Sequence, residues 1–353
     1  MPDAPSPSNA DLSELLLAAA AEQEGHRARA LNRAGRDARF WPEEAAAVLA
    51  SGRPLTELRS VGPWVGEQLT GWIEEPPPAV DIPPERAGFL TFAEVRAILD
   101  GAGEPWTSSA VADLQVHSTD SDGASPIEEM AAAARDLGRT CIAHTDHSVG
   151  LKIAHGQTDE ELRDQGRRIE ALNAVFAGRG DAFRSLRAIE LDVFPDGSSD
   201  AMDPALLHQL DLVLGAFHSS LRVKEDQTER YLAALRNPDV LILAHPSARM
   251  FGRRVGLSAD WPRVFAEAAR LGKAVEIDAT PARQDLRLEH ARLAVAAGVT
   301  TFSLGSDAHT TGELGFLPFG MAIAAAAGVR PETVLNLRAP DEVIAWGREL
   351  RER

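Results

Sequence analysis

The stretch Asp113-Leu114-Gln115-Val116-His117-Ser118-Thr119-Asp120-Ser121-Asp122-Gly123 decides the fold. Its first part continues an apolar run from Val111 to Val116 that is typical of a buried strand. This strand delivers His117 and Asp122 into the polar turn that follows it. Imidazole and carboxylate are both metal ligands, so the sequence predicts a metal site at the end of the strand.

An apolar run that ends in ligand-type residues recurs six more times along the chain. The residues at these run ends are His144, Asp146 and His147; Glu190 and Asp192; His218; His245; Asp278; and Asp307 and His309. Segments rich in Ala, Leu, Glu and Arg lie between most of the runs, which predicts repeating strand-helix units. In a parallel barrel all strand C-termini open on one face, where active sites form. The runs therefore predict one shared site.

The composition is that of a large acidic chain. At 353 residues and 44% hydrophobic content, it is long enough for one large domain and a small one. The net charge of −17 argues against generic adhesion to nucleic acid or to an anionic membrane, and leaves room only for a local basic patch. Cys141 is the single cysteine, and the apolar stretch from Leu15 to Ala21 is too short to span a bilayer. We expect a soluble, cytoplasmic protein.

Four segments are expected along the chain. Residues 1–10 are rich in Pro, Ser and Asn, which predicts a disordered tail, and residues 11–75 predict a small helical domain. Residues 76–111 begin with a Pro-rich stretch and are interpreted as a linker to the large domain at 112–353. The helical domain closes with two short apolar segments joined by Ser60-Val61-Gly62-Pro63, which resemble a helix-hairpin-helix unit. The tight turn of such a unit presents backbone N–H groups to a DNA phosphate.

Two substitutions weaken the match to that unit. Ser60 replaces the first Gly of the hairpin, and Trp64 fills the usual basic position. A packing module that has lost its DNA affinity is the alternative, and residues 1–75 are net acidic, which favours it. The candidate nucleic-acid contacts are Val61, Gly62 and the helical ridge Arg29, Arg33 and Arg36, with Arg253 and Arg254 in the large domain.

The large domain resembles the polymerase-and-histidinol-phosphatase (PHP) domain, a metal-dependent phosphoesterase fold. The resemblance rests on the ordered set His117, Asp122, Thr145-Asp146-His147-Ser148, Glu190, His218-Ser219, Ala244-His245-Pro246 and Asp307-Ala308-His309. The first 75 residues resemble the start of bacterial family X DNA polymerases, which carry a C-terminal PHP domain. Only about 37 residues, from Glu75 to Val111, lie between the two parts, which is too few for a polymerase palm and fingers.

The resemblance implies a distorted seven-stranded (β/α) barrel, similar to a TIM barrel, that holds three divalent ions of manganese, zinc or iron. The implied ligands are Gln115, His117, Glu190 and Asp307 for the first ion; Glu190, His218 and His245 for the second; and Asp122, His147 and His309 for the third. Gln115 departs from the usual His-x-His pattern. Its amide oxygen is a weaker donor than imidazole, which lowers the expected occupancy of the first site.

The expected chemistry is hydrolysis of a phosphate ester. Arg249 and Arg283 are candidates for holding the phosphate oxygens, although Arg283 has Asp285 and Glu276 as alternative partners. Asp146 and Asp192 are expected to orient ligating imidazoles. His26, His155, His208 and His290 are assigned to helix faces or the loop surface. His144 departs from the family pattern, and three roles stay open for it: an extra ligand, an acid, or an outer-contact or packing residue.

Three functions stay open at this point. The first is a 3′–5′ exonuclease or 3′-end-processing enzyme in DNA repair, with DNA as partner. The second is a phosphatase of small phosphate esters, similar to histidinol-phosphate phosphatase. The third is a DNA-repair scaffold without catalysis, against which the retention of buried histidines and carboxylates argues, since they are costly when unpaired.

Overall fold

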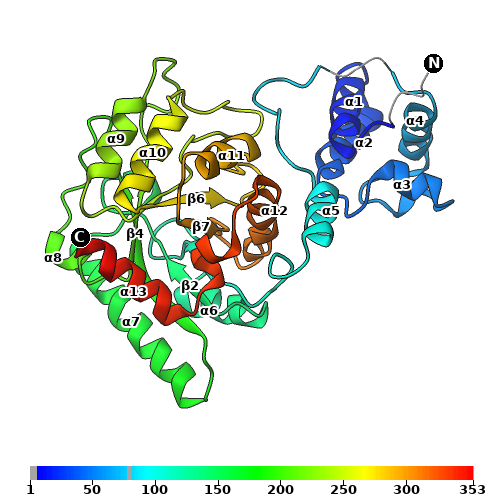
Figure 1. Ribbon diagram of the computed structural model, residues 1–353. Coiled ribbons are helices and arrows are strands. Elements are labelled where there is room, and N and C mark those ends of the chain that lie inside the picture. The colour runs from blue at the N-terminus through cyan, green and yellow to red at the C-terminus, as the bar shows by residue number, and fades with distance from the viewer. Residues whose placement is uncertain (1–5, 78–80, 353) are drawn as a thin grey trace. The chain divides into compact units, whose positions relative to one another are not determined.

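The computed structural model describes residues 6–77 and 81–352. The chain divides into two compact units, Met1–Gly101 and Ala102–Arg353. The first unit is helical (Figure 1). Its helices are α1 (Asn9–Ala21), α2 (Gly25–Ala38), α3 (Ala45–Ala50), the short η1 (Leu55–Glu57), α4 (Pro63–Glu74) and α5 (Phe92–Ala102). They enclose a core that includes Leu12, Leu16, Leu31, Trp41, Val48, Val65 and Leu69.

Helix α1 begins inside the predicted tail. Ser8 Oγ accepts a hydrogen bond from the Asp11 N–H at 3.2 Å, and the Asp11 carboxylate accepts one from the Ser8 N–H at 2.9 Å. This reciprocal pair satisfies two N–H groups that a helix start leaves without partners. Residues 8–10 therefore belong to the helical unit, whereas residues 1–5 of the predicted tail lie outside the described part.

The first unit also takes up much of the predicted linker. The Phe92 N–H donates to the Arg39 carbonyl at 2.8 Å, and Arg39 donates to the Phe89 carbonyl at 2.9 Å. Arg96 donates to the Pro42 carbonyl at 2.9 Å. These bonds fasten the first turns of α5 and Phe89 before it to the residues that follow α2, and the compact unit extends to residue 101.

The second unit is built on seven parallel strands in the order β1 to β7, so the predicted barrel is confirmed. The strands are β1 (Asp113–Val116), β2 (Cys141–His144), β3 (Arg184–Asp192), β4 (Leu212–Ala216), β5 (Ile242–Leu243), β6 (Ala274–Asp278) and β7 (Phe302–Gly305). Six of them are buried along their whole length. Helices cover one side and the barrel interior the other, which explains why the strands are continuous apolar runs.

The barrel closes between its first and last strands without a full ladder. Val116 and Ala308 form a single parallel bridge. The Asp307 N–H donates to the Gln115 carbonyl at 3.0 Å, and the His117 N–H donates to the Ala308 carbonyl at 2.8 Å. This contact brings the polar turn after β1 beside the turn after β7.

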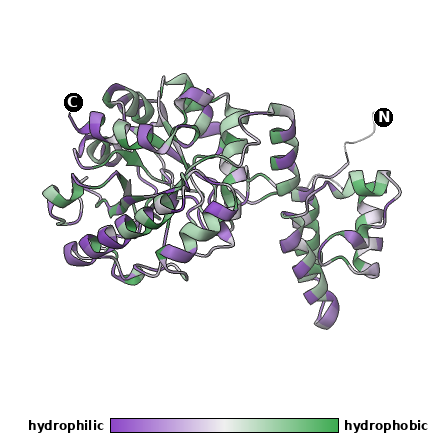
Figure 2. Cartoon of the chain, turned by 90° about the horizontal axis from the view of Figure 1, so that it is seen from below, coloured by the Kyte–Doolittle hydropathy of each residue, from purple (hydrophilic) through white to green (hydrophobic). Residues whose placement is uncertain are grey.

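Helices surround the strands (Figure 1). They are α6 (Ile127–Asp136), α7 (Asp159–Gly178), α8 (Pro204–Leu207), α9 (Thr228–Arg236), α10 (Trp261–Leu271), α11 (Leu288–Ala296), α12 (Leu317–Ala327) and α13 (Pro340–Arg351), with the short η2 (Lys152–Ala154), η3 (Glu313–Phe316), η4 (Pro331–Thr333) and η5 (Leu335–Leu337). Single helices carry both hydrophilic and hydrophobic residues (Figure 2), as expected when one side packs on the barrel. Within residues 6–77 and 81–352, no helix combines the length and the hydropathy needed to cross a bilayer.

Candidate metal centre

The ligand-type residues lie at the C-terminal ends of six of the seven strands. They are His117 and Asp122 after β1, His147 after β2, Glu190 in β3, His218 after β4, His245 after β5, and Asp307 and His309 after β7. Two of them have left-handed backbone, with φ of 24° at His245 and 51° at Asp307. Such φ values are uncommon outside glycine and concentrate at functional sites.

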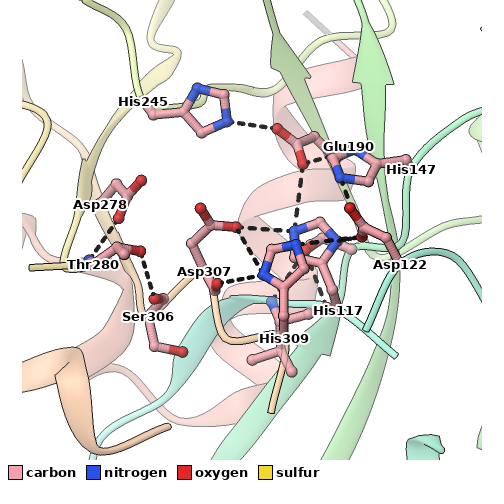
Figure 3. A network of polar contacts seen from close by, with 12 residues as sticks. His117, Asp122, His147, Glu190, His245, Asp278, Thr280, Ser306, Asp307 and His309 are labelled. Carbon is pink, nitrogen blue, oxygen red and sulfur yellow. Dashed lines mark hydrogen bonds and ion pairs between the residues drawn. The ribbon is translucent and has the colours of Figure 1, made fainter. Parts of the chain in front are cut away.

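Glu190 lies at the centre of the group. Its Oε1 atom lies 2.7 Å from His245 Nε2 and 3.4 Å from His218 Nε2. Its Oε2 atom lies 3.2 Å from His147 Nδ1 and 3.4 Å from His117 Nε2. Figure 3 shows His245 approaching one oxygen and His117 the other. Each oxygen thus faces its own pair of imidazoles, as a carboxylate does when it bridges two cations.

Asp122 and Asp307 extend the group on the side of β1 and β7. Asp122 Oδ1 lies 3.3 Å from His309 Nε2 and 3.5 Å from His147 Nε2. Asp307 Oδ1 lies 3.1 Å from His117 Nε2. Two sets of atoms each lie within 4.8 Å of one another, and they belong to His117, Asp122, His147 and His309, and to His147, Glu190 and His218.

These separations fit the coordination shell of a divalent ion. Ligand atoms about 2.1 Å from an ion lie roughly 3.0 Å apart in an octahedral shell and roughly 3.4 Å apart in a tetrahedral one. All but one of the imidazole-to-carboxylate distances above are 3.1 to 3.5 Å. Within the described chain, several of these buried atoms also form no hydrogen bond, namely His117 Nδ1 and Nε2, His147 Nδ1, His218 Nε2 and Glu190 Oε2. Metal ligation would satisfy atoms that are otherwise costly to bury.

Known proteins with similar sequences include a polymerase and several probable phosphatases. No protein-family model matches the chain. Over 235 residues, 66% of its length, the chain is 40% identical to the DNA polymerase/3′-5′ exonuclease PolX of Bacillus subtilis, of which the match covers 40%. Over 242 residues it is 29% identical to a probable phosphatase of Syntrophotalea carbinolica, with 65% of this chain and 93% of the relative covered. This chain is a PHP-domain protein related to the family X polymerases.

Two solved structures of low similarity accompany these relatives. Histidinol phosphate phosphatase of Lactococcus lactis, complexed with zinc, L-histidinol and phosphate, matches with 12% identity and a TM-score of 0.41 over 69% of this chain and 92% of that one. A putative histidinol phosphatase of Listeria monocytogenes matches with 12% identity and a TM-score of 0.45 over 58% of this chain and 97% of that one. At these scores the fold assignment depends on the strand order and register.

The carboxylates of the PHP site are held in their ionised form. Burial raises the pKa of Glu190, but the His147 and His245 imidazoles lower it well below its usual range. Burial likewise raises the pKa of Asp307, but the Arg283 guanidinium together with the His117 and His309 imidazoles lowers it below its usual range. Both side chains are therefore anionic at neutral pH, which is the form in which a carboxylate binds metal.

The imidazoles differ in charge. Burial lowers the pKa of His147 to about 4, so this ring is neutral at pH 7 and ready to ligate. Burial lowers the pKa of His218 too, but Glu190 and Asp192 raise it to about 9. A cation that binds His218 therefore displaces a proton.

The two carboxylates predicted to orient imidazoles differ in their contacts. Asp192 Oδ1 lies 3.3 Å from His218 Nδ1, as predicted for an orienting residue. Asp146 instead accepts hydrogen bonds from the Ser118 N–H at 2.8 Å and from Ser121 Oγ. The Gln165 amide on α7 also donates to Asp146. Asp146 thus holds the turn that carries Asp122. The sequence did not reveal this role, because each of the three partners lies 19 to 28 residues from Asp146.

Gln115 has a partner that the sequence does not reveal. Its side chain is buried, and in the amide orientation that satisfies its surroundings its nitrogen donates to Glu276 Oε2 at 2.9 Å. Glu276 also accepts the His245 N–H at 2.7 Å. The sequence suggested Glu276 only as a partner of Arg283, but Glu276 on β6 reaches Gln115 on β1 past the intervening strand β7. The sequence feature that could have revealed Glu276 is its place on β6, two residues before the ligand-type residue Asp278.

The two arginines predicted to hold phosphate differ in their surroundings. Arg283 Nε lies 3.1 Å from Asp307 Oδ2 and 3.5 Å from Asp278 Oδ2, and neither of the two alternative partners considered, Asp285 and Glu276, is paired with it. Arg249 is buried, and its charge contributes to lowering the pKa of His290. Arg283 is therefore held against the Asp307 carboxylate, one of the predicted ligands.

The other histidines lie apart from the ligands. His144 is buried with Nε2 3.3 Å from Ser185 Oγ, which is a packing position. His290 is buried against Trp261, with ring centroids 4.6 Å apart, and is not on the surface. The three exposed ones are His26, His155 and His208.

The hairpin of the first unit offers few of the contacts expected of a DNA-binding turn. Val61 is buried in the helical core, while Gly62 is exposed at the N-terminus of α4. Ser60 has a φ of 65° and donates to the Asp37 carboxylate, so this carboxylate lies beside the turn. Arg27 lies over the Trp64 ring at 5.1 Å. The ridge residues Arg29, Arg33 and Arg36 are exposed on α2.

Proposed function

We propose that this PHP-domain protein is a metal-dependent phosphoesterase that acts on DNA 3′ ends, as a 3′–5′ exonuclease or an end-processing enzyme. The observation that carries the phosphoesterase proposal is the Glu190 carboxylate, whose two oxygens face separate imidazole pairs. A carboxylate shared in this way supports neighbouring divalent ions, which polarise a phosphoryl oxygen and activate water when bound.

The chain's own residues arrange that site. The three ligand groups proposed for the ions are Gln115, His117, Glu190 and Asp307; Glu190, His218 and His245; and Asp122, His147 and His309. Asp192 fixes the His218 ring through Nδ1, and Arg283 fixes Asp307. Asp146 holds the turn that carries Asp122 by accepting hydrogen bonds from Ser118 and Ser121. Such outer contacts hold ligands in one orientation and so reduce the reorganisation needed during reaction.

DNA is preferred as substrate because of the relationship to PolX. The chain is 40% identical over 235 residues to a relative that is named both a polymerase and a 3′–5′ exonuclease. The chain spans only 40% of that relative, so the activity and the DNA partner are carried over as part of this proposal.

A small phosphate ester is the second candidate. It is supported by the probable phosphatase of Syntrophotalea carbinolica, because the alignment covers 93% of that protein. A scaffold without catalysis is the third candidate, and it predicts no turnover with any ester.

One assay separates these candidates. Full-length protein is stripped of metal, reloaded with manganese, and incubated with a 5′-labelled single-stranded oligonucleotide, with histidinol phosphate and with p-nitrophenyl phosphate. We expect a ladder of shortened DNA that Asp307→Ala abolishes and that His208→Ala, which changes an exposed histidine, retains. Turnover of the small esters alone would transfer the function to the second candidate. No turnover of any substrate by the metal-loaded protein would contradict the phosphoesterase proposal.

A further inference from the structure

A group of arginines without carboxylate partners lies on the His218 side of the centre. Within the described residues, Arg222, Arg253 and Arg254 form no ion pair, although the chain has a net charge of −17. Burial lowers the pKa of Arg254, and the neighbouring charges of Arg283, Arg222 and Arg253 lower it further. Arg254 therefore lies among like charges that the Asp285 carboxylate opposes, and an anion beside Arg254 and Arg222 would relieve the repulsion between them.

These arginines border a cavity of about 540 Å³. Its lining is His218, Ser220, Leu221, Arg222, Val223 and Arg254. His218 connects this space to the PHP site, because its Nε2 atom lies 3.4 Å from Glu190 Oε1. The cavity is therefore next to the place where the scissile phosphate is proposed to bind.

The lining matches one kind of ligand. Arg254 Nε donates to the Ala248 carbonyl at 3.1 Å, which fixes the guanidinium while its two terminal nitrogens keep their donors. A fixed planar guanidinium binds a phosphate through two hydrogen bonds at once. Leu221 and Val223 add apolar surface of the kind that contacts a sugar or a base.

We propose that this cavity binds a second phosphate of the substrate, one that is not cleaved, through Arg222 and Arg254. The inference depends on the proposed phosphoesterase function and narrows its substrate class. The substrate is then an ester in which a sugar connects the scissile phosphate to another phosphate, as at a nucleic-acid end. A lone phosphomonoester leaves the arginines uncompensated.

A matched pair of dinucleotides tests the proposal. TpT and its 5′-phosphorylated form pTpT contain the same cleavable diester and differ by one phosphate. With manganese-loaded full-length protein, we expect pTpT to have the higher kcat/KM. The ratio of the two kcat/KM values should fall about tenfold in Arg222→Ala and less in Arg222→Lys, which keeps the charge but loses the planar donor pair. Arg222 is exposed, so its replacement does not disturb the core.

The control is Arg179→Ala. Arg179 is an exposed arginine that follows α7, and it has no ion pair among the described residues, so the variant removes the same charge elsewhere. The ratio should stay at the wild-type value in this variant. A ratio in Arg222→Ala within twofold of wild type overturns the proposal, and so does an equal fall in Arg179→Ala.

The same comparison separates this proposal from the proposed function. If the protein cleaves only phosphomonoesters, thymidine 3′-monophosphate and thymidine 3′,5′-bisphosphate replace the dinucleotides and the ratio is read in the same way. If it cleaves no ester, the proposed function has failed, and calorimetry with TpT and pTpT gives the ratio of the two Kd values. Tighter binding of pTpT that is lost in Arg222→Ala still supports binding of a phosphate in this cavity. Equal Kd values for TpT and pTpT in the wild-type protein contradict it.

Discussion

At the scale of single residues, Glu190 has the largest predicted effect. Glu190→Gln keeps the shape of the side chain but removes the charge that is shared by four imidazoles. We expect bound manganese per chain to fall by at least one ion and hydrolysis to fall roughly 100-fold or more. Elemental analysis and initial rates are the measurements, with His208→Ala as the control. Full metal content in Glu190→Gln would show that this carboxylate bridges nothing.

His290 gives the stability of the fold a dependence on pH. Burial lowers its pKa to about 3, with help from the charge of Arg287, whereas a free imidazole titrates near 6.5. Between these values the unfolded chain binds a proton that the folded chain excludes, so this contribution to stability is lost as pH falls below about 6.5. We expect the stability gap between wild type and His290→Gln to shrink by on the order of 1 kcal/mol per pH unit from pH 6.5 to 4.5. Urea unfolding of metal-free protein at several pH values measures it, and a gap independent of pH would show that the imidazole titrates normally.

The residue pattern predicted that ligand-type side chains from successive strand ends lie on one face, and the ligand groups followed from the resemblance to the PHP domain. Histidine and carboxylate after successive apolar runs are informative because parallel strands must end on one face. The partner of Gln115 was not predictable, because Glu276 reaches it from a strand about 160 residues later. The pairing of Arg283 with Asp307 was missed for the same reason, since a sequence does not show which of several nearby carboxylates an arginine contacts.

At the scale of elements, α7 supports the turn that carries Asp122. The Gln165 amide on this helix donates to Asp120 at 2.9 Å and also to Asp146. Gln165→Ala leaves both carboxylates with one donor fewer, which should cost about 1–3 kcal/mol of stability. It should also weaken metal binding, because the turn is then less well held. Thermal unfolding and metal titration check this, with Val175→Ala, at an exposed position of the same helix, as the control. Metal affinity equal to wild type would show that the hydrogen bonds from Ser118 and Ser121 to Asp146 hold the turn without Gln165.

The prediction of elements was accurate where apolar periodicity extends over a whole helix or strand. The helices expected between the apolar strands are present, such as α7, which is capped by Thr158 and separates β2 from β3. The predicted end of the first unit at residue 75 differs from the observed end at residue 101. The hydrogen bonds that attach Phe89–Arg96 to Arg39 and Pro42 join segments that are distant in sequence. Local composition contains no signal for such bonds.

At the scale of the whole molecule, the acidic chain needs a local basic surface to bind DNA. The ridge Arg29, Arg33 and Arg36 on α2 is exposed and is the candidate in the first unit. If it contacts phosphates, changing all three to Ala should reduce the slope of log Kd against log salt by roughly 2 to 3 for a single-stranded oligonucleotide. Fluorescence anisotropy at several salt concentrations measures it. The same number of substitutions at Arg163, Arg167 and Arg179, which are exposed in the second unit, is the control. An unchanged slope would make the ridge an ordinary solvated surface.

The incomplete closure of the barrel gives the ligands a second role. One bridge joins Val116 of β1 to Ala308 just after β7. The proposed ligand groups include His117 and Asp122 from one edge and Asp307 and His309 from the other. A cation bound across this gap cross-links positions about 190 residues apart in the chain. Closing so long a loop costs conformational entropy, and binding energy that is available only in the folded state offsets that cost. The ions proposed for catalysis would thus also fasten the first strand to the last, as a disulfide does in proteins that can form one.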